Sequence, residues 1–183
     1  AIDPSLNGEL YRAAQENMES LRLLPADQLE PVEAYALGNL FFERQKMDEA
    51  LTYYLAASAG SPSVLKGQMD ILLFRTAYIY CKKAKWKQSL HYVERFCAGY
   101  PESSLAKDAV SLYYAAAWNV FINDQNENTQ RKLIDAITLY LNKCTDCPDR
   151  GEAHFQLGRY YQKKGNSDNA VGEYSLVTAN SPN

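Results

Sequence analysis

The sequence lacks a long hydrophobic run and lacks an excess of charge of one sign. Its longest apolar stretch, from Tyr113 to Trp118, is far shorter than the roughly 20 residues that a membrane-spanning helix needs. It has 19 lysines and arginines against 22 aspartates and glutamates, a net charge of -3, and no basic stripe of the kind that binds phosphate backbones. We therefore expect no transmembrane segment and no nucleic-acid partner.

Histidine is also scarce, with only two residues in the chain. His91 falls in the middle of an expected helix, where exposure to solvent is the default. His154 is expected in the core, which the family resemblance described below implies. No nucleophile is paired with a base in the sequence, and general acid-base or covalent catalysis has no support. We expect no enzyme.

Four cysteines are present, and Cys144-x-x-Cys147 is their only motif. A zinc site needs about four ligands, and no second cysteine pair or histidine pair completes one. Cys97 lies four residues before Pro101, as Cys144 lies four before Pro148, so we interpret the thiols as structural. A local disulfide and a metal or redox role are the alternatives. No cofactor and no metal are expected.

What the sequence does contain is one pattern in three segments. Each segment begins with an apolar residue or threonine, followed by Gly or Ala and then by an aromatic residue. A second small residue, two packing residues and a proline complete it. The first and last of these seven positions are 25 residues apart. The segments are Leu37-Gly38-x-x-Phe41, Ala50-x3-Tyr54-x2-Ala57 and Pro62; Thr76-Ala77-x-x-Tyr80, Ser89-x3-Val93-x2-Phe96 and Pro101; and Leu157-Gly158-x-x-Tyr161, Ala170-x3-Tyr174-x2-Val177 and Pro182.

Small residues at these positions allow two helices to approach at an axis spacing of about 8–10 Å. Proline ends the second helix, because the residue before it is pushed out of the α region. Breaker stretches such as Lys164 to Ser167 separate the two helices.

The pattern resembles the tetratricopeptide repeat, a helix-turn-helix unit of about 34 residues. The resemblance implies an all-α fold, a right-handed α-α superhelix with about nine helices. It divides the chain into an N-terminal helix (1–30) and four repeats (31–64, 65–103, 104–150 and 151–183). The leading helix follows from Asp3-Pro4 and an apolar stripe: Leu6, Leu10, Ala13, Ala14, Met18, Leu21 and Leu24.

The third repeat is irregular. Its first helix is expected from about Leu105 to Ile122, a polar loop from Asn123 to Thr129, and its second helix carries Ala136-x3-Tyr140-x2-Lys143 before Pro148. The run from Tyr100 to Ala109 resembles the elongated repeats of bacterial envelope proteins, including the outer-membrane assembly lipoprotein and the Tol-Pal coordinator. This likeness favours a periplasmic location, whereas four cysteines without an evident pairing fit a reducing cytoplasm.

In the tetratricopeptide family the first helix of each repeat lines an inner, concave surface. The resemblance implies a partner-binding groove of Tyr35, Asn39, Phe42, Phe74, Tyr78, Lys82, Trp118, Phe155, Arg159 and Gln162, with Cys81, Ser111, Ala115 and Lys163 beside them. Asn39 matches one position of the chaperone-type carboxylate clamp, but Tyr35 stands where that clamp has a lysine.

The leading hypothesis is a protein-interaction scaffold that binds a peptide segment or partner protein in this aromatic groove. The alternative is a structural or assembly subunit that uses the ends of the array, including self-association through the C-terminal end. At that end Val171, Tyr174 and Val177 are expected to be exposed, because no capping helix follows. The other interpretation is that the chain is a fragment of a longer array. A third reading is an enzyme or regulatory thiol domain based on Cys144 and Cys147.

Overall fold

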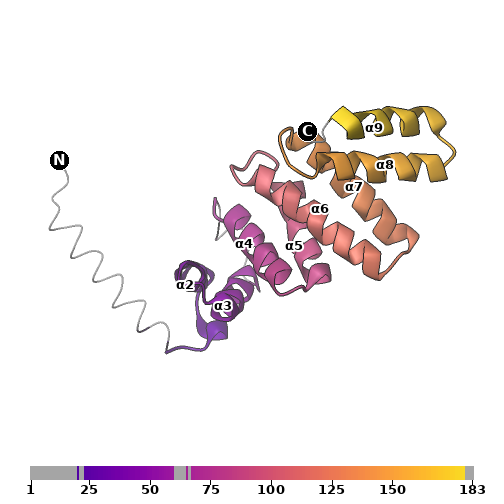
Figure 1. The fold of residues 1–183 in the computed structure, drawn as a ribbon. Helices are drawn as coiled ribbons and strands as arrows, with labels where there is room; N and C mark the ends of the chain where they lie inside the picture. The colour runs from indigo at the N-terminus through magenta and orange to yellow at the C-terminus, as the bar shows by residue number, and fades with distance from the viewer. Residues whose placement is uncertain (1–19, 21–22, 60–64, 66, 180–183) are drawn as a thin grey trace, which may run out of the picture. The chain divides into compact units, whose positions relative to one another are not determined.

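The computed structural model describes residues 20, 23–59, 65 and 67–179, and within these residues the fold is all α, without a strand (Figure 1). One 3-10 helix, η1 (Ala26–Gln28), precedes eight α-helices. These are α2 (Pro31–Glu43), α3 (Met47–Ala59), α4 (Met69–Lys82), α5 (Trp86–Gly99), α6 (Ala106–Asn123), α7 (Glu127–Lys143), α8 (Arg150–Lys163) and α9 (Ser167–Ala179). Most of the leading helix expected over 1–30 lies outside the described residues, as do Pro62 and Pro182. No helix in the described part is both long and apolar enough to cross a membrane.

The chain divides into two compact units within α4, between Leu72 and Leu73. In the first unit α2 packs against α3. Proline at the first position of α2 and a capping box between Glu30 and Glu33 start that helix. Gly38 lies under the ring of Tyr54, where an added Cβ would be 2.6 Å from the ring carbon Cδ1. The small residue of the pattern therefore permits the close approach of the two helices.

In the second unit the helices pack in chain order, α5 on α6, α6 on α7, α7 on α8 and α8 on α9 (Figure 1). The part of α4 in this unit is joined to α5 by a hydrogen bond from the buried Ser89 hydroxyl to the carbonyl of Ala77, 2.9 Å long. At the other end of the unit, Gly158 of α8 lies under Tyr174 of α9, again 2.6 Å from an added Cβ. The contact at Gly38 thus recurs at the matching position of the pattern.

Three turns between paired helices have one geometry. In the first, the amide of Gln45 donates to the carbonyl of Phe42, and the next amide donates to the carbonyl of Phe41, which closes a Schellman motif. The turns at Ala84 and Gly165 have the same two bonds. Each central residue has a positive φ, 59° at Gln45, 52° at Ala84 and 75° at Gly165.

The connection from α6 to α7 differs, and it corrects the expected loop from Asn123 to Thr129. Helix α6 includes Asn123, and α7 already begins at Glu127, so only three residues connect them. The reason is a capping box: the Asn126 side chain accepts from the Thr129 amide, and the Thr129 hydroxyl accepts from the Asn126 amide. A polar stretch that looked like loop in the sequence is thus the first turn of a helix.

Candidate functional site

Two pockets in the second unit share one residue, Trp118 of α6. The acidic pocket, of about 440 Å³, is lined by Ser111, Tyr114, Ala115, Trp118, Asn119, Tyr140, Cys147, Pro148, Asp149 and Glu152. The basic pocket, of about 370 Å³, is lined by Trp118, Phe121, Ile122, Gln125, Gln130, Leu133, Ile134, Gln156, Arg159, Tyr160 and Lys163. Trp118 is half-buried, so one aromatic side chain forms a wall of both.

The acidic pocket combines aromatic rings with carboxylates. Tyr114 of α6 and Tyr140 of α7 lie with ring centroids 5.1 Å apart, and both are more than nine-tenths buried. Asp149 directly precedes α8, and Glu152 lies in its first turn. Burial raises the pKa of the Tyr114 hydroxyl, and the negative charges of Glu152 and Asp149 raise it further. Burial also raises the pKa of Tyr140 and the charge of Asp149 adds to the effect, whereas a hydrogen bond with the Asp149 backbone and the charge of Arg150 lower it. The two carboxylates therefore act electrostatically on the rings of the pocket.

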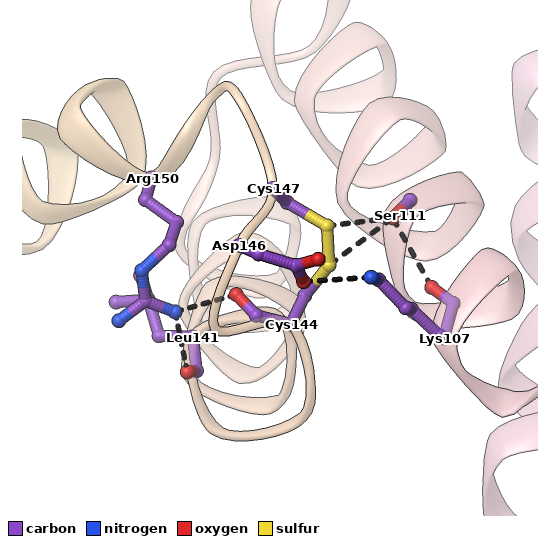
Figure 2. Close-up of a disulfide and its surroundings, with 7 residues drawn as sticks. All are labelled: Lys107, Ser111, Leu141, Cys144, Asp146, Cys147 and Arg150. Atoms are coloured by element: carbon purple, nitrogen blue, oxygen red, sulfur yellow. Dashed lines mark hydrogen bonds and ion pairs between the residues drawn. A yellow bond between two sulfur atoms is a disulfide. The ribbon is translucent and has the colours of Figure 1, made fainter. Parts of the chain in front are cut away.

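A disulfide between Cys144 and Cys147 shapes the loop between α7 and α8, which contributes Cys147, Pro148 and Asp149 to the acidic pocket (Figure 2). Their Cα atoms are 5.5 Å apart, within the usual range of about 4.4–6.8 Å. This pairing corrects our interpretation of these two cysteines as structural thiols. The cause is local: Cys144 is the residue after α7, and the turn that follows brings the side chain three residues later back onto it.

Further contacts hold the same loop (Figure 2). The Arg150 guanidinium donates through Nη1 to the carbonyls of Leu141 and Cys144, at 2.7 and 2.6 Å, which satisfies acceptors at the end of α7. The Lys107 ammonium of α6 lies 2.6 Å from a carboxylate oxygen of Asp146. Ser111 Oγ lies 4.0 Å from one disulfide sulfur and 3.9 Å from the other. The loop is thus joined both to α7 and to α6.

The two cysteines and Asp146 also group three potential metal-ligating side chains. Cys144, Asp146 and Cys147 hold their potential ligand atoms within 4.8 Å of one another. In the paired state the two sulfurs are bonded to each other and offer no thiolate. The remaining carboxylate forms an ion pair with Lys107. The cluster is a structural element of the loop in this state.

The basic pocket has apolar walls and two cations. Leu133 is buried and Phe121 half-buried, whereas Ile122 is 46% exposed. Arg159 and Lys163 lie on α8, four residues apart, and so share one face of that helix. The guanidinium carbon of Arg159 lies 6.0 Å from the centroid of the Phe155 ring. This arrangement suits an apolar group beside an anion.

Of the ten residues expected to line the groove, Trp118 and Arg159 line the basic pocket, and Trp118 also lines the acidic one. Phe155 is 40% exposed next to Arg159, and Gln162 accepts a 2.9 Å hydrogen bond from the Tyr174 hydroxyl.

The other expected residues lie on α4 and α2. On α4, Phe74 stacks against Tyr78, and the Lys82 ammonium lies 5.4 Å from the Tyr78 ring. In the first unit the Tyr35 side chain is only 6% exposed, and the ring centroids of Phe42 and Tyr54 lie 6.4 Å apart. Asn39 accepts a hydrogen bond from the Tyr54 hydroxyl. That bond gives Asn39 a structural role within its own unit.

Sequence reasoning missed five residues of the acidic pocket: Tyr114, Asn119, Tyr140, Asp149 and Glu152. Tyr140 was identified only as a packing position of the third repeat. Asp149 comes from the loop that the disulfide shapes, so its place depends on a pairing that the sequence did not settle. The signal that could have found it is the pair of acidic residues Asp149 and Glu152 shortly after Pro148, taken together with the aromatic residues of α6.

The two histidines lie as expected. His91 is exposed, with its ring edge-on to Tyr92. His154 is 5% exposed, and its Nδ1 lies 2.8 Å from a carboxylate oxygen of Glu173 on α9. His154 therefore joins α8 to α9 in the core.

No protein-family model matches the chain, and no curated protein matches it. Among solved structures, the chain is similar to the one described as "MamA AMB-1 C2221", with a TM-score of 0.55. The match covers 94% of this chain and 91% of that one at 14% sequence identity. At this identity the likeness shows the fold alone. Together with the eight α-helices of the described residues, it confirms the predicted fold class at the level of an all-α helical-repeat fold.

Proposed function

We propose that the chain is a protein-interaction scaffold that binds an extended or helical segment of a partner protein across Trp118. The observation that carries the proposal is that this one half-buried tryptophan lines both pockets. Two pockets on either side of one aromatic wall suit successive side chains of a bound segment. Tryptophan is also among the residues that contribute most to binding energy at interfaces.

The helical-repeat fold supports the same function. Such folds present side chains of successive helices on extended surfaces, and binding is their common use. In the second unit the pocket residues come from α6, α7 and α8 and from the two connections between these helices. The remaining residues of the expected groove, on α2 and α4, stay a hypothesis for further contacts with the partner.

A random peptide library displayed against the chain tests this proposal. The affinity of the selected peptides is measured by fluorescence anisotropy for the native chain and for Trp118→Ala. Loss of an aromatic hot spot of about 2 kcal/mol corresponds to an affinity roughly 30-fold weaker. Trp86→Ala is the matched control, because Trp86 begins α5 and lines neither pocket.

The control should leave the affinity within a factor of about two, the scatter expected of a residue outside the interface. Thermal unfolding of both variants shows that each remains folded. Equal weakening by the two substitutions, or selected peptides whose affinity Trp118→Ala leaves unchanged, would refute binding at Trp118.

A second candidate function, assembly through the end of the array, has one observation in its favour. Val171 of α9 is 67% exposed and Leu176 of the same helix is 43% exposed. Exposed apolar side chains on one helix favour contact with another protein surface. The expected outcome is a mass in light scattering that rises with concentration and returns to the monomer in Val171→Glu. A strict monomer at all concentrations would contradict this function.

A further inference from the structure

The acidic pocket differs from the basic pocket in its charge. Asp149 and Glu152 line it together with the rings of Tyr114, Trp118 and Tyr140. None of the described residues that line it is a lysine or an arginine. A cavity of about 440 Å³ thus presents three aromatic side chains and two carboxylates, with no lining cation to neutralise them.

Two cations lie beside this pocket without lining it, and the positive charge of Arg150 acts on Tyr140. Arg150 donates through Nη1 to two backbone carbonyls at the end of α7. Lys107 pairs with Asp146, outside the pocket lining. The Glu152 carboxylate accepts a hydrogen bond from the neutral side chain of Gln156. Within the described residues neither Asp149 nor Glu152 forms an ion pair, so their charge is available to a ligand.

The charge of these carboxylates reaches the aromatic wall. After burial, Glu152 and Asp149 are the largest causes of the raised pKa of Tyr114. A group that enters the pocket therefore meets the half-buried Trp118 side chain and the negative potential of the two carboxylates. Anions are disfavoured there, and an apolar group would gain nothing from the charge of the two carboxylates.

We propose that the acidic pocket is a receptor for an arginine side chain of the partner segment. The inference rests on the proposed function, because it names the chemistry that this part of the surface recognises. A guanidinium is planar, stacks on aromatic rings and donates two parallel hydrogen bonds to a carboxylate. A lysine ammonium carries the same charge but lacks the planar face and the paired donors. The combination of aromatic walls and two carboxylates therefore selects arginine over lysine.

Three isotope-coded pools of nine-residue peptides test the assignment. The central residue of each pool is arginine, lysine or citrulline, a neutral isostere of arginine, and all other positions are random. The pools are mixed in equal amounts with the immobilised full chain, and the retained peptides are counted by mass spectrometry. We expect the arginine pool to be enriched about tenfold over the citrulline pool, the size of a charge-assisted hydrogen bond to one carboxylate.

The double variant Asp149→Asn with Glu152→Gln should reduce this enrichment to within about twofold, because the charge-assisted bonds are lost. Glu127→Gln with Asp135→Asn is the matched control. It removes the same charge from α7 at two exposed residues that do not line the acidic pocket, and it should keep the arginine preference. Circular dichroism checks that both double variants keep their helices.

Each other outcome has a definite meaning. Equal retention of arginine and citrulline peptides, or a preference that survives the Asp149 and Glu152 substitutions, overturns the arginine assignment while peptide binding stands. Equal retention of lysine and arginine peptides also overturns it, since the site would then recognise charge alone. Retention of no pool by the native chain overturns the proposed function itself.

Discussion

Gly38 and Gly158 lie at the same position of the sequence pattern, yet a methyl group added at each should have a different cost. In both cases an ideal Cβ would lie 2.6 Å from a tyrosine ring, that of Tyr54 or that of Tyr174. Tyr54 is fully buried, whereas Tyr174 is partly exposed. The ring of Tyr174 can therefore move towards solvent, and the ring of Tyr54 cannot.

The magnitudes follow from three contributions. Alanine stabilises a helix interior by about 1 kcal/mol relative to glycine. Overpacking in a filled core costs about 1–3 kcal/mol. Displacing Tyr54 also endangers its part-buried 2.8 Å hydrogen bond to Asn39, which contributes about 1 kcal/mol, whereas the matching bond from Tyr174 to Gln162 is exposed and water can replace it. Gly38→Ala should thus destabilise the first unit by about 1–3 kcal/mol, and Gly158→Ala should change the stability of its unit by less than about 1 kcal/mol.

Native-state hydrogen exchange measures these changes separately, because it gives a local opening free energy for the amides of α2 and α3 and for those of α8 and α9. Gly172→Ala is the control, since nothing lies within 4 Å of a Cβ at this position of α9. It should stabilise α9 by up to about 1 kcal/mol. The reasoning fails if Gly38→Ala costs no more than Gly158→Ala.

Two further predictions concern the cysteines. Replacing Cys144 and Cys147 together by serine should lower the free energy of unfolding of the second unit by about 2 kcal/mol. This is the chain-entropy value for a closed loop of four residues. Equal stability of the native and variant chains in guanidinium titrations would contradict it. Burial, with Glu94 adding, raises the pKa of the Cys97 thiol to about 11. The alkylation rate of Cys97 should therefore increase about tenfold per pH unit from pH 8 to 10, because the thiolate forms only as the pH approaches that pKa. An alkylation rate that reaches a plateau below pH 9 would show a thiol of ordinary pKa.

The helices and their contacts were the predictable part of this molecule. The positions of Gly38, Ala77 and Gly158 depend on local periodicity, and periodicity determines which face of a helix meets its neighbour. Ala50, Ser89 and Ala170, the second small residues of the pattern, are all buried as expected. The pattern occurs in three segments, so a wrong assignment of helix positions in one segment would have disagreed with the other two.

The pockets were harder to predict, because they depend on side chains that meet only after folding. Tyr114 and Tyr140 are 26 positions apart in the sequence, and nothing local shows that their rings approach. Asp149 and Cys147 come from a connection whose path follows from the disulfide and from Arg150. The sequence contained each of these residues, but it did not show which of them share a cavity.

The long helix pair has a consequence for recognition. Helices α6 and α7 have 18 and 17 residues, whereas the other α-helices have 13 or 14, and both pockets draw on this pair. An array of identical units would offer the same contacts at every step, and a bound segment could shift by one unit without losing any. The irregular pair removes that equivalence. Under the proposed function, a segment that docks across Trp118 would have one frame in which its side chains fit, and the departure from repetition would fix its alignment.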